Sequence, residues 1–417
     1  MNRSSRSRTC TSTSARPPRR SADERPRADP CARPVRPAPG SGPETRPRQQ
    51  NGPMDQGERR GGGVAGLQAD DATVFGRGTA LLGCGGGGRV DHMVSALRFA
   101  LGDRSVPVVD LDDPALGSVV AVGLIGSTTV LEEKMPSGEE LPAALAAVER
   151  WTGTRADAVV AAQIGGVTGP AAALTAHAAG LPLVDADLVG RAVPRIDQLS
   201  VFVGPTTTVT AAAATTSGLR IVVDARHPHD VETVWREAVS HSGGWAAFAI
   251  GPVPVALLRE RAVVGSVQRA LRIGRAAGGA RDAAELAALI GGRVVAQGRV
   301  IDVQREGDAL AFVRSSLAIR DAGTGAVARV EAGSEYVHCL VDGLPVASTP
   351  SVITVVDARS LAPVATDRTR VGNELAVLVL PSAPWWWADP DRTARMGPRA
   401  FGIDADVVPE AVGQVLA

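Results

Sequence analysis

Lysine, aromatic residues and cysteine are all scarce in this 417-residue chain, and each shortage narrows what it can be. Lysine and arginine together number 44, and Lys134 is the only lysine. Because a planar guanidinium cannot replace a compact amine at a tight site, the single lysine indicates a functional position, with chance retention on a surface loop as the alternative. Aromatic residues make up only 3% of the chain, so its core must consist mainly of aliphatic side chains.

The four cysteines are not spaced as metal ligands, and Cys10 and Cys31 lie in an Arg-rich N-terminal segment. This usage is typical of a reducing compartment and predicts no disulfide framework. No apolar run is long enough to span a membrane, and the N-terminus lacks the apolar part of a signal peptide. We therefore expect a cytoplasmic protein without a membrane partner.

The formal net charge of zero hides an asymmetry along the chain. Residues 1–53 carry 12 Arg against four acidic residues, a net +8, so the remainder carries −8. A folded nucleic-acid-binding surface is basic, so the acidic remainder predicts no nucleic-acid partner. Residues 1–63 contain almost no large apolar side chains and are predicted to be a disordered basic tail. Met54 is then a plausible true start.

Two further regions follow the tail. Alternating strand and helix patterns over 64–290 predict an α/β domain with a mainly parallel sheet and flanking helices. Short strands between Gly-, Asp- and Pro-rich turns predict a smaller, mostly antiparallel β domain over 291–383. The expected strands cover 293–304, 310–319, 326–332, 335–341, 344–347, 351–357 and 374–380. The last segment, 384–417, opens with three adjacent tryptophans that cannot all face one core. We expect this segment to pack at the seam between the domains.

The first candidate cluster is the glycine run of Gly85, Gly86 and Gly87. An expected strand over Thr79–Gly83 precedes them and an expected helix over Val90–Leu101 follows, an arrangement that directs backbone N–H groups at an anion. The alternative is that the glycines serve only close packing.

Two more clusters follow predicted buried strands. Gly165 and Gly166 end the strand over Ala156–Ile164, and Asp185 and Asp187 end the next one. Since ligands bind at the carboxyl ends of parallel strands, the three clusters predict one ligand site. The alternative for the aspartates is that they are ordinary turn formers.

The lysine lies on an expected loop before a helix over Glu139–Arg150, where Ser137 and Glu140 are spaced as a capping box. Glu132 and Glu133 beside Lys134 favour its charged form, so a charged anchor fits better than a nucleophile.

Further along, Asp224–Asp230 holds two His and two Asp, but the spacing fits no zinc pattern. We read Asp230 as a helix N-cap and predict no metal site. Helices are expected over 254–276 and 281–290.

Several motifs together resemble the S-methyl thiohydantoin desulfurase-like family. They are Gly83-Cys84-Gly85-Gly86-Gly87-Gly88, Glu133-Lys134-Met135-Pro136-Ser137-Gly138-Glu139-Glu140, Ile164-Gly165-Gly166, Val184-Asp185-Ala186-Asp187-Leu188-Val189-Gly190-Arg191-Ala192 and Gly397-Pro398-Arg399-Ala400-Phe401-Gly402. The resemblance runs from about residue 72 to the C-terminus. It implies an N-terminal α/β domain, a C-terminal β domain and a link to hydantoin or related cyclic-amide metabolism. This chain departs from the family pattern at Arg89, Gln163 and Thr168, where an acidic residue, Glu and Asn are usual.

The resemblance implies a hydrolase-like reaction in which water attacks the ring of an S-methyl thiohydantoin and methanethiol leaves. Asp185 or Asp187 would be the base, and Lys134 and Arg191 would anchor the ligand. Backbone N–H groups of Gly85–Gly87 and Gly165–Gly166 would stabilise the developing negative charge. A non-catalytic module that binds a small anion, or an accessory subunit of a hydantoinase- or oxoprolinase-type system, are the alternatives. The cofactor and a homo-oligomeric state stay open.

Overall fold

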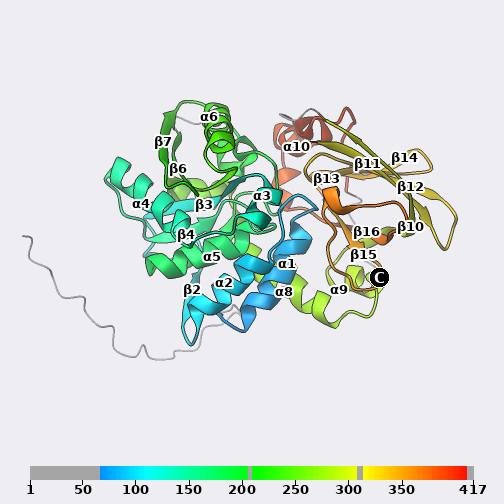
Figure 1. The fold of residues 1–417 in the computed structure, drawn as a ribbon, viewed down its shortest axis with the longest axis horizontal. Coiled ribbons are helices and arrows are strands. Elements are labelled where there is room, and N and C mark those ends of the chain that lie inside the picture. The colour runs from blue at the N-terminus through cyan, green and yellow to red at the C-terminus, as the bar shows by residue number, and fades with distance from the viewer. Residues whose placement is uncertain (1–65, 205–208, 308–312, 411–417) are drawn as a thin grey trace, which may run out of the picture. The chain divides into compact units, whose positions relative to one another are not determined.

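The computed structural model describes residues 66–204, 209–307 and 313–410, so the predicted tail over 1–63 lies outside the described residues. Within those ranges the secondary structure forms two sheets with helices around the first (Figure 1). The predicted fold class is confirmed: a mixed sheet with flanking helices, then an antiparallel sheet.

The first sheet has the strand order β1-β2-β5-β4-β3-β8-β6-β7, with β9 paired to β5. Parallel pairing joins β2, β5, β4 and β3, and the other pairs are antiparallel. The strands are β1 Gly66–Gln68, β2 Ser105–Val109, β3 Ser118–Gly126, β4 Ala158–Ala161, β5 Leu183–Asp187, β6 Val209–Thr215, β7 Arg220–Ala225, β8 Trp245–Pro254 and β9 Val263–Val264.

Both faces of this sheet are covered because its central strands are apolar on both sides. On β3, Val120 and Val122 join the core beneath α1, α2, α4, α5 and α8, whereas Val119 and Ala121 join the core beneath α6 and α7. The helices are α1 Asp71–Leu82, α2 Asp91–Leu101, α3 Thr128–Glu133, α4 Glu140–Thr152, α5 Thr168–Ala179, α6 Pro228–His241, α7 Val255–Arg261, α8 Ser266–Gly279, α9 Ala283–Leu289 and α10 Pro390–Met396.

The second sheet is antiparallel throughout, in the order β14-β13-β12-β11-β10-β16-β15. Its strands agree closely with the predicted ones, apart from residues 310–312, which lie outside the described ranges. They are β10 Arg293–Glu306, β11 Arg314–Asp321, β12 Val327–Ala332, β13 Tyr336–Val341, β14 Leu344–Ser348, β15 Val352–Asp357 and β16 Glu374–Leu380.

Three local predictions are wrong. The expected strand over Thr79–Gly83 is the last part of α1, which packs against α8. The expected helix over 254–276 is two helices, α7 and α8, separated by the short β9. Asp230 is not an N-cap, because α6 begins at Pro228 and Asp230 lies in its first turn.

The three adjacent tryptophans do not all enter one core. Trp386 is 1% exposed in the core beneath α6 and α7, and its Nε1 donates to Val189 O at 2.7 Å. Trp385 and Trp387 are half-buried and donate instead to Glu260 O and to the Ser382 hydroxyl.

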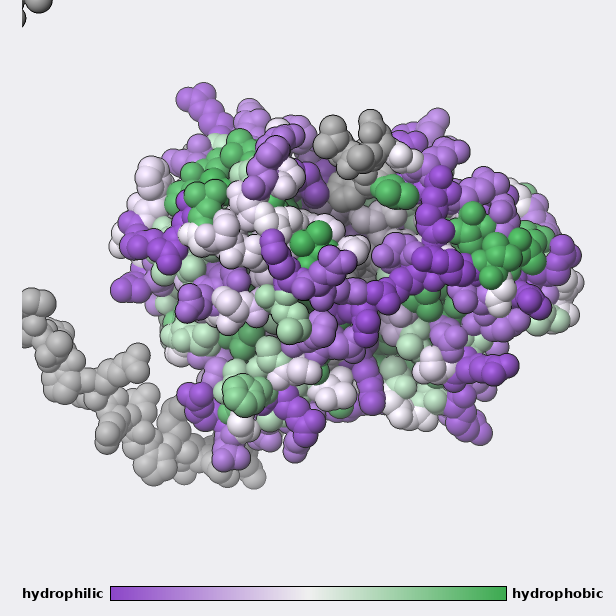
Figure 2. Space-filling view, in the orientation of Figure 1, coloured by the Kyte–Doolittle hydropathy of each residue, from purple (hydrophilic) through white to green (hydrophobic). Residues whose placement is uncertain are grey.

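The face in Figure 2 is mostly hydrophilic, with separate hydrophobic patches. It therefore singles out no partner surface, and the homo-oligomer stays open. Among the described helices, none is both long enough and apolar enough to cross a membrane.

Candidate functional site

A cavity of about 810 Å³ lies at the carboxyl ends of β3 and β4. Its walls come from the glycine loop after α1, the start of α5, the residues after β5, helix α6, the start of β8 and the residues just before β13. The volume is in the range of small-molecule sites, and the position matches the general rule for sheets with parallel strands. The expectation of a ligand site at this edge therefore has a matching cavity.

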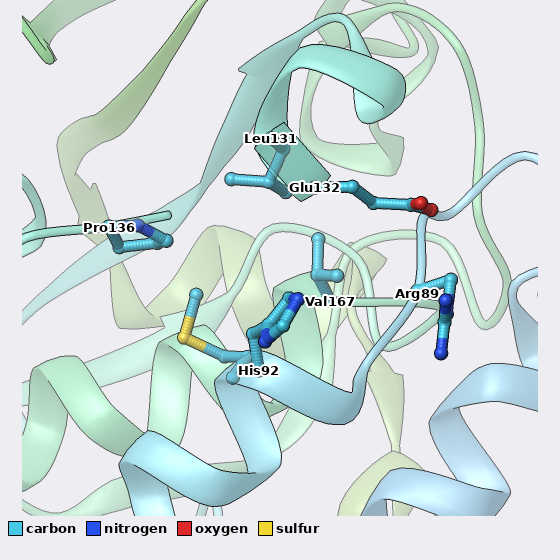
Figure 3. A pocket seen from close by; sticks show the side chains of 7 residues that line it. Arg89, His92, Leu131, Glu132, Pro136 and Val167 are labelled. Atoms are coloured by element: carbon cyan, nitrogen blue, oxygen red, sulfur yellow. The ribbon is translucent and has the colours of Figure 1, made fainter. Parts of the chain in front are cut away.

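A second, much smaller pocket adjoins this cavity, and Figure 3 shows the side chains around it. Leu131, Glu132 and Pro136 of the lysine segment form part of its wall, and Leu131 and Val167 line both spaces. Its volume of about 10 Å³ holds at most one water, so it is too small for a substrate.

Glu335 is the carboxyl group that stands out in the large cavity. It lines the wall although its residue is only 2% exposed, and it accepts a hydrogen bond from the Ser334 hydroxyl. Burial raises the pKa of Glu335 from its ordinary 4.5 to about 7, while the Ser334 hydrogen bond and the charge of Arg191 oppose the rise. A carboxyl with a pKa near 7 can both take and give a proton at neutral pH.

Gly86 is the residue that lets the Glu335 carboxyl approach the glycine loop. A Cβ on Gly86 would lie 2.5 Å from Glu335 Oε1 and 2.5 Å from Ser334 O. Side chains do not tolerate such distances, so only glycine fits beside this carboxyl at position 86.

The glycine N–H groups, in contrast, are largely used within the protein. Gly86 and Gly87 both donate to Gly83 O at 3.0 Å, and Gly166 donates to Thr79 O at 2.6 Å. A Cβ on Gly166 would lie 1.9 Å from Gly87 O. These glycines let two loops pack closely together, which is the alternative stated above for them. Three of the N–H groups that were predicted to face an anion already have partners within the protein.

Gln163 and Thr168, two departures from the family pattern, both line the cavity. Gln163 Oε1 accepts a hydrogen bond from Val193 N at 2.7 Å, so the amide oxygen is engaged and the NH₂ group keeps its donors. Thr168 is the first residue of α5, whose N-terminus carries partial positive charge. This end of the cavity is therefore rich in donors.

The part of the wall that α6 forms contains an ion pair between a buried glutamate and a half-buried arginine. Glu232 is 2% exposed and accepts hydrogen bonds from the Arg236 guanidinium and from Ile196 N. Burial raises the pKa of Glu232, while Arg236 opposes the rise. Arg236 also donates to Pro194 O at 2.6 Å, so the pair fixes α6 against the segment after β5.

Asp185 and Asp187, the predicted bases, lie in β5 and are not among the described residues that line the cavity. Asp185 Oδ1 accepts hydrogen bonds from Val267 N and Gln268 N at the start of α8. Asp187 Oδ2 accepts three, from Ile164 N, Val189 N and Gly190 N. Both carboxyls therefore hold backbone N–H groups in place. Burial raises the pKa of each, that of Asp187 to about 7.

Lys134 and Arg191, the predicted anchors, are also outside the described lining of the cavity. Lys134 is exposed at the C-terminus of α3, and its backbone O accepts a hydrogen bond from Trp245 Nε1 at 2.8 Å. Trp245 itself lines the cavity, so the lysine lies near its rim. Arg191 is fully buried and contacts the backbone of the second sheet.

Three further residues line the cavity and were not predicted from the sequence: Glu335, Glu232 and Arg236. Glu335 is the first residue of a predicted strand and has no predicted role, although it is an acidic residue at the start of an apolar segment and precedes the only tyrosine, Tyr336. That acidic residue was the available signal.

The sheet order defines an α/β protein with a second, antiparallel sheet, and a cavity lies at the edge of its first sheet. Family models match nearly all of the described chain: the S-Me-THD-like N-terminal domain over 70–225 and the S-Me-THD-like C-terminal domain over 226–410. The chain therefore belongs to the S-methyl thiohydantoin desulfurase-like family.

A crystal structure of a protein from Chromobacterium violaceum has a similar fold, with a TM-score of 0.68 and 23% sequence identity. The match covers 83% of this chain and 100% of that one. A search of curated proteins found no match. The two family models meet at 225/226, whereas the sequence predicts a domain boundary near 290. That boundary stays a prediction.

Proposed function

We propose that this protein is a hydrolase-like enzyme that acts on a small cyclic amide of the S-methyl thiohydantoin or hydantoin type, with Glu335 as its acid–base group. The supporting observation is a nearly fully buried carboxyl, with a pKa of about 7, in the wall of a cavity of substrate size. Perturbed carboxyls in clefts are good candidates for catalytic groups. Small-molecule chemistry of this kind would fit the cytoplasmic setting expected from the cysteines.

In the proposed reaction, ionised Glu335 takes a proton from water as the water oxygen forms a bond to the ring carbon that carries the S-methyl group. The electron pair of the C=N bond moves to the ring nitrogen, which receives the second proton of the water. The carbon–sulfur bond breaks as the C=O bond forms, and Glu335 gives its proton to the departing sulfur. The products are a hydantoin and methanethiol, and Glu335 returns to its starting state. No electron acceptor or donor is needed.

The polar groups of the cavity favour a neutral ring with carbonyl oxygens. The Gln163 NH₂ group and the N-terminal end of α5 offer donors to such oxygens. A ligand carboxylate would instead face the buried carboxyl of Glu335, whereas the charge of Glu232 is paired with Arg236. We therefore expect closed rings to bind better than ring-opened carboxylates.

A non-catalytic binding module is the second candidate, and Gln163 favours it. The amide at that position cannot titrate, and its Oε1 is held by the Val193 backbone. On this hypothesis the same cavity binds the ring without turnover. Asp185, Asp187, Lys134 and Arg191 stay predictions under both candidates.

The test combines thermal shift with a thiol-release assay on S-methyl thiohydantoin. The wild type should be stabilised by the ligand and should release methanethiol with a rate that rises through a pH of about 7, as the base ionises. Glu335→Gln should lower kcat by about 100-fold or more while the ligand still stabilises the protein. Binding without thiol release would favour the binding module, and no binding by closed rings would contradict both candidates.

Gly86→Ala is the matched steric probe, because its added Cβ collides with the Glu335 carboxyl and Ser334 O. We expect weaker ligand binding. Gly279→Ala is the control, since a Cβ there meets nothing within 4 Å. Equal ligand affinity in both variants would place the ligand away from Glu335.

A further inference from the structure

Arg191 makes contacts that join the first sheet to the backbone beside Glu335. It follows β5, and its side chain is among the largest that are fully buried. Nη1 donates to Ser351 O at 2.7 Å and Nη2 donates to Tyr336 O at 3.1 Å. Nε donates to Ala192 O at 3.2 Å, which ties the same guanidinium to its own segment.

The residue after Glu335 is held from both sides. Tyr336 N donates to Cys84 O of the glycine loop at 2.8 Å, while Tyr336 O accepts from Arg191. The position of Glu335 relative to Gly86 is therefore determined by these two contacts to its neighbour.

We propose that Arg191 is a positioning residue that holds the Glu335 carboxyl against the glycine loop and controls its protonation. The inference rests on the proposed function, in which Glu335 is the acid–base group. A guanidinium suits this role because its fork reaches two carbonyl oxygens at once and carries a permanent charge.

The charged and titratable groups that act on Glu335 come from three places. Arg191 lowers the pKa of Glu335 more than Arg236 does, and burial opposes both. The Cys84 thiol of the glycine loop also interacts with Glu335, and burial raises the pKa of that thiol. Arg191 is thus the strongest cationic influence on this carboxyl.

The experiment follows the Glu335 carboxyl directly, by NMR titration of protein labelled with ¹³C at the glutamate carboxyl. The Glu335 resonance is identified by its absence in Glu335→Gln. Arg191→Gln removes the charge but keeps a donor, and should raise the titration midpoint by about one pH unit, a tenfold change in proton affinity. Arg191→Lys keeps the charge and should shift the midpoint much less, and Arg236→Gln should raise it less than Arg191→Gln.

A folded Arg191→Gln with an unchanged midpoint overturns the positioning role. If that variant does not fold, the test of the positioning role relies on Arg191→Lys. An ammonium cannot reproduce the fork, so hydrogen exchange at the Val337 amide, just beyond the Tyr336 carbonyl, should become faster while the midpoint stays near that of the wild type. Unchanged exchange, or a midpoint raised as far as by loss of charge, overturns the proposal. A wild-type midpoint below about 5 would instead contradict the acid–base role in the proposed function.

Discussion

At the scale of single residues, two buried carboxyls with the same pKa of about 7 have different surroundings. Asp187 Oδ2 accepts three backbone N–H groups, whereas Glu335 accepts one hydroxyl and borders the cavity. A raised pKa alone therefore does not identify a catalytic group, because burial raises it wherever the carboxyl lies. Of these two carboxyls, Glu335 lines the cavity and Asp187 does not, so Glu335 is the better candidate for an acid–base group.

The raised pKa of Glu335 predicts how stability depends on pH. Folded Glu335 holds its proton up to a pH of about 7, while the unfolded chain releases it near 4.5. Between these values the folded state binds more protons, so the free energy of unfolding should fall as pH rises, by an upper bound of about 3 kcal/mol. Below 4.5 this contribution is fully present, and above 7 it is lost.

Urea unfolding of the wild type and Glu335→Gln at pH 5 and pH 8 checks this expectation. The Gln variant cannot ionise and should lose less stability than the wild type between the two conditions. Asp187→Asn removes the other carboxyl with a raised pKa and is the control. It should leave the pH dependence of stability that is due to Glu335 unchanged. An equal pH dependence in the wild type and Glu335→Gln would show that Glu335 ionises normally.

At the scale of elements, the contact between α1 and α8 depends on glycine. A Cβ on Gly78 would lie 1.8 Å from Ala270 O, and a Cβ on Gly274 would lie 1.8 Å from Val74 O. The two helices thus approach closely at one glycine from each. Glycine weakens a helix in isolation, so α1 is helical because of this packing rather than its own propensity.

Gly78→Ala should therefore destabilise the protein by about 3 kcal/mol, because a backbone carbonyl cannot move aside as a flexible side chain can. Gly279→Ala on α8 has open space and should be neutral or slightly stabilising. Denaturant titration of both variants tests the difference. Equal stabilities would mean that the helices separate at little cost.

At the scale of the whole molecule, the two sheets share a hydrophobic core. The cluster beneath α1, α2, α4, α5 and α8 also contains Val352 and Val356 of β15 and Leu378 of β16. The Arg191 and Tyr336 hydrogen bonds cross the same boundary. Among the described residues, helices that cover the first sheet and strands of the second sheet therefore pack into one core.

This shared core predicts one unfolding transition for both sheets. Pulsed hydrogen exchange with mass spectrometry, read along a urea series, should give the same midpoint for peptides from β3–β4 and from β15–β16. Well-separated midpoints would show that the sheets unfold independently. Arg191→Gln, which removes the charge at the boundary, should separate them more than Gly279→Ala does.

The sequence by itself determined the family, the fold class and most elements of the second sheet. Period-2 patterns between Gly-rich turns are local, so the limits of β12 and β16 follow from a few neighbouring residues. The sequence also predicted a site at the edge of the first sheet where the cavity lies, because Gly165 and Gly166 follow a predicted strand there. That a ligand binds in this cavity stays a prediction.

Only the tertiary structure decided which groups occupy that edge. The sequence predicts that Gly86 and Asp185 lie at strand ends, whereas Gly86 follows helix α1 and Asp185 lies within β5. Burial and distance depend on segments far apart in sequence. Glu335 reaches the cavity because the second sheet packs against the glycine loop about 250 residues earlier, whereas the Asp185 carboxyl accepts hydrogen bonds from the N-terminus of α8. A carboxyl's role follows from its desolvation and partners, and these exist only after long-range packing.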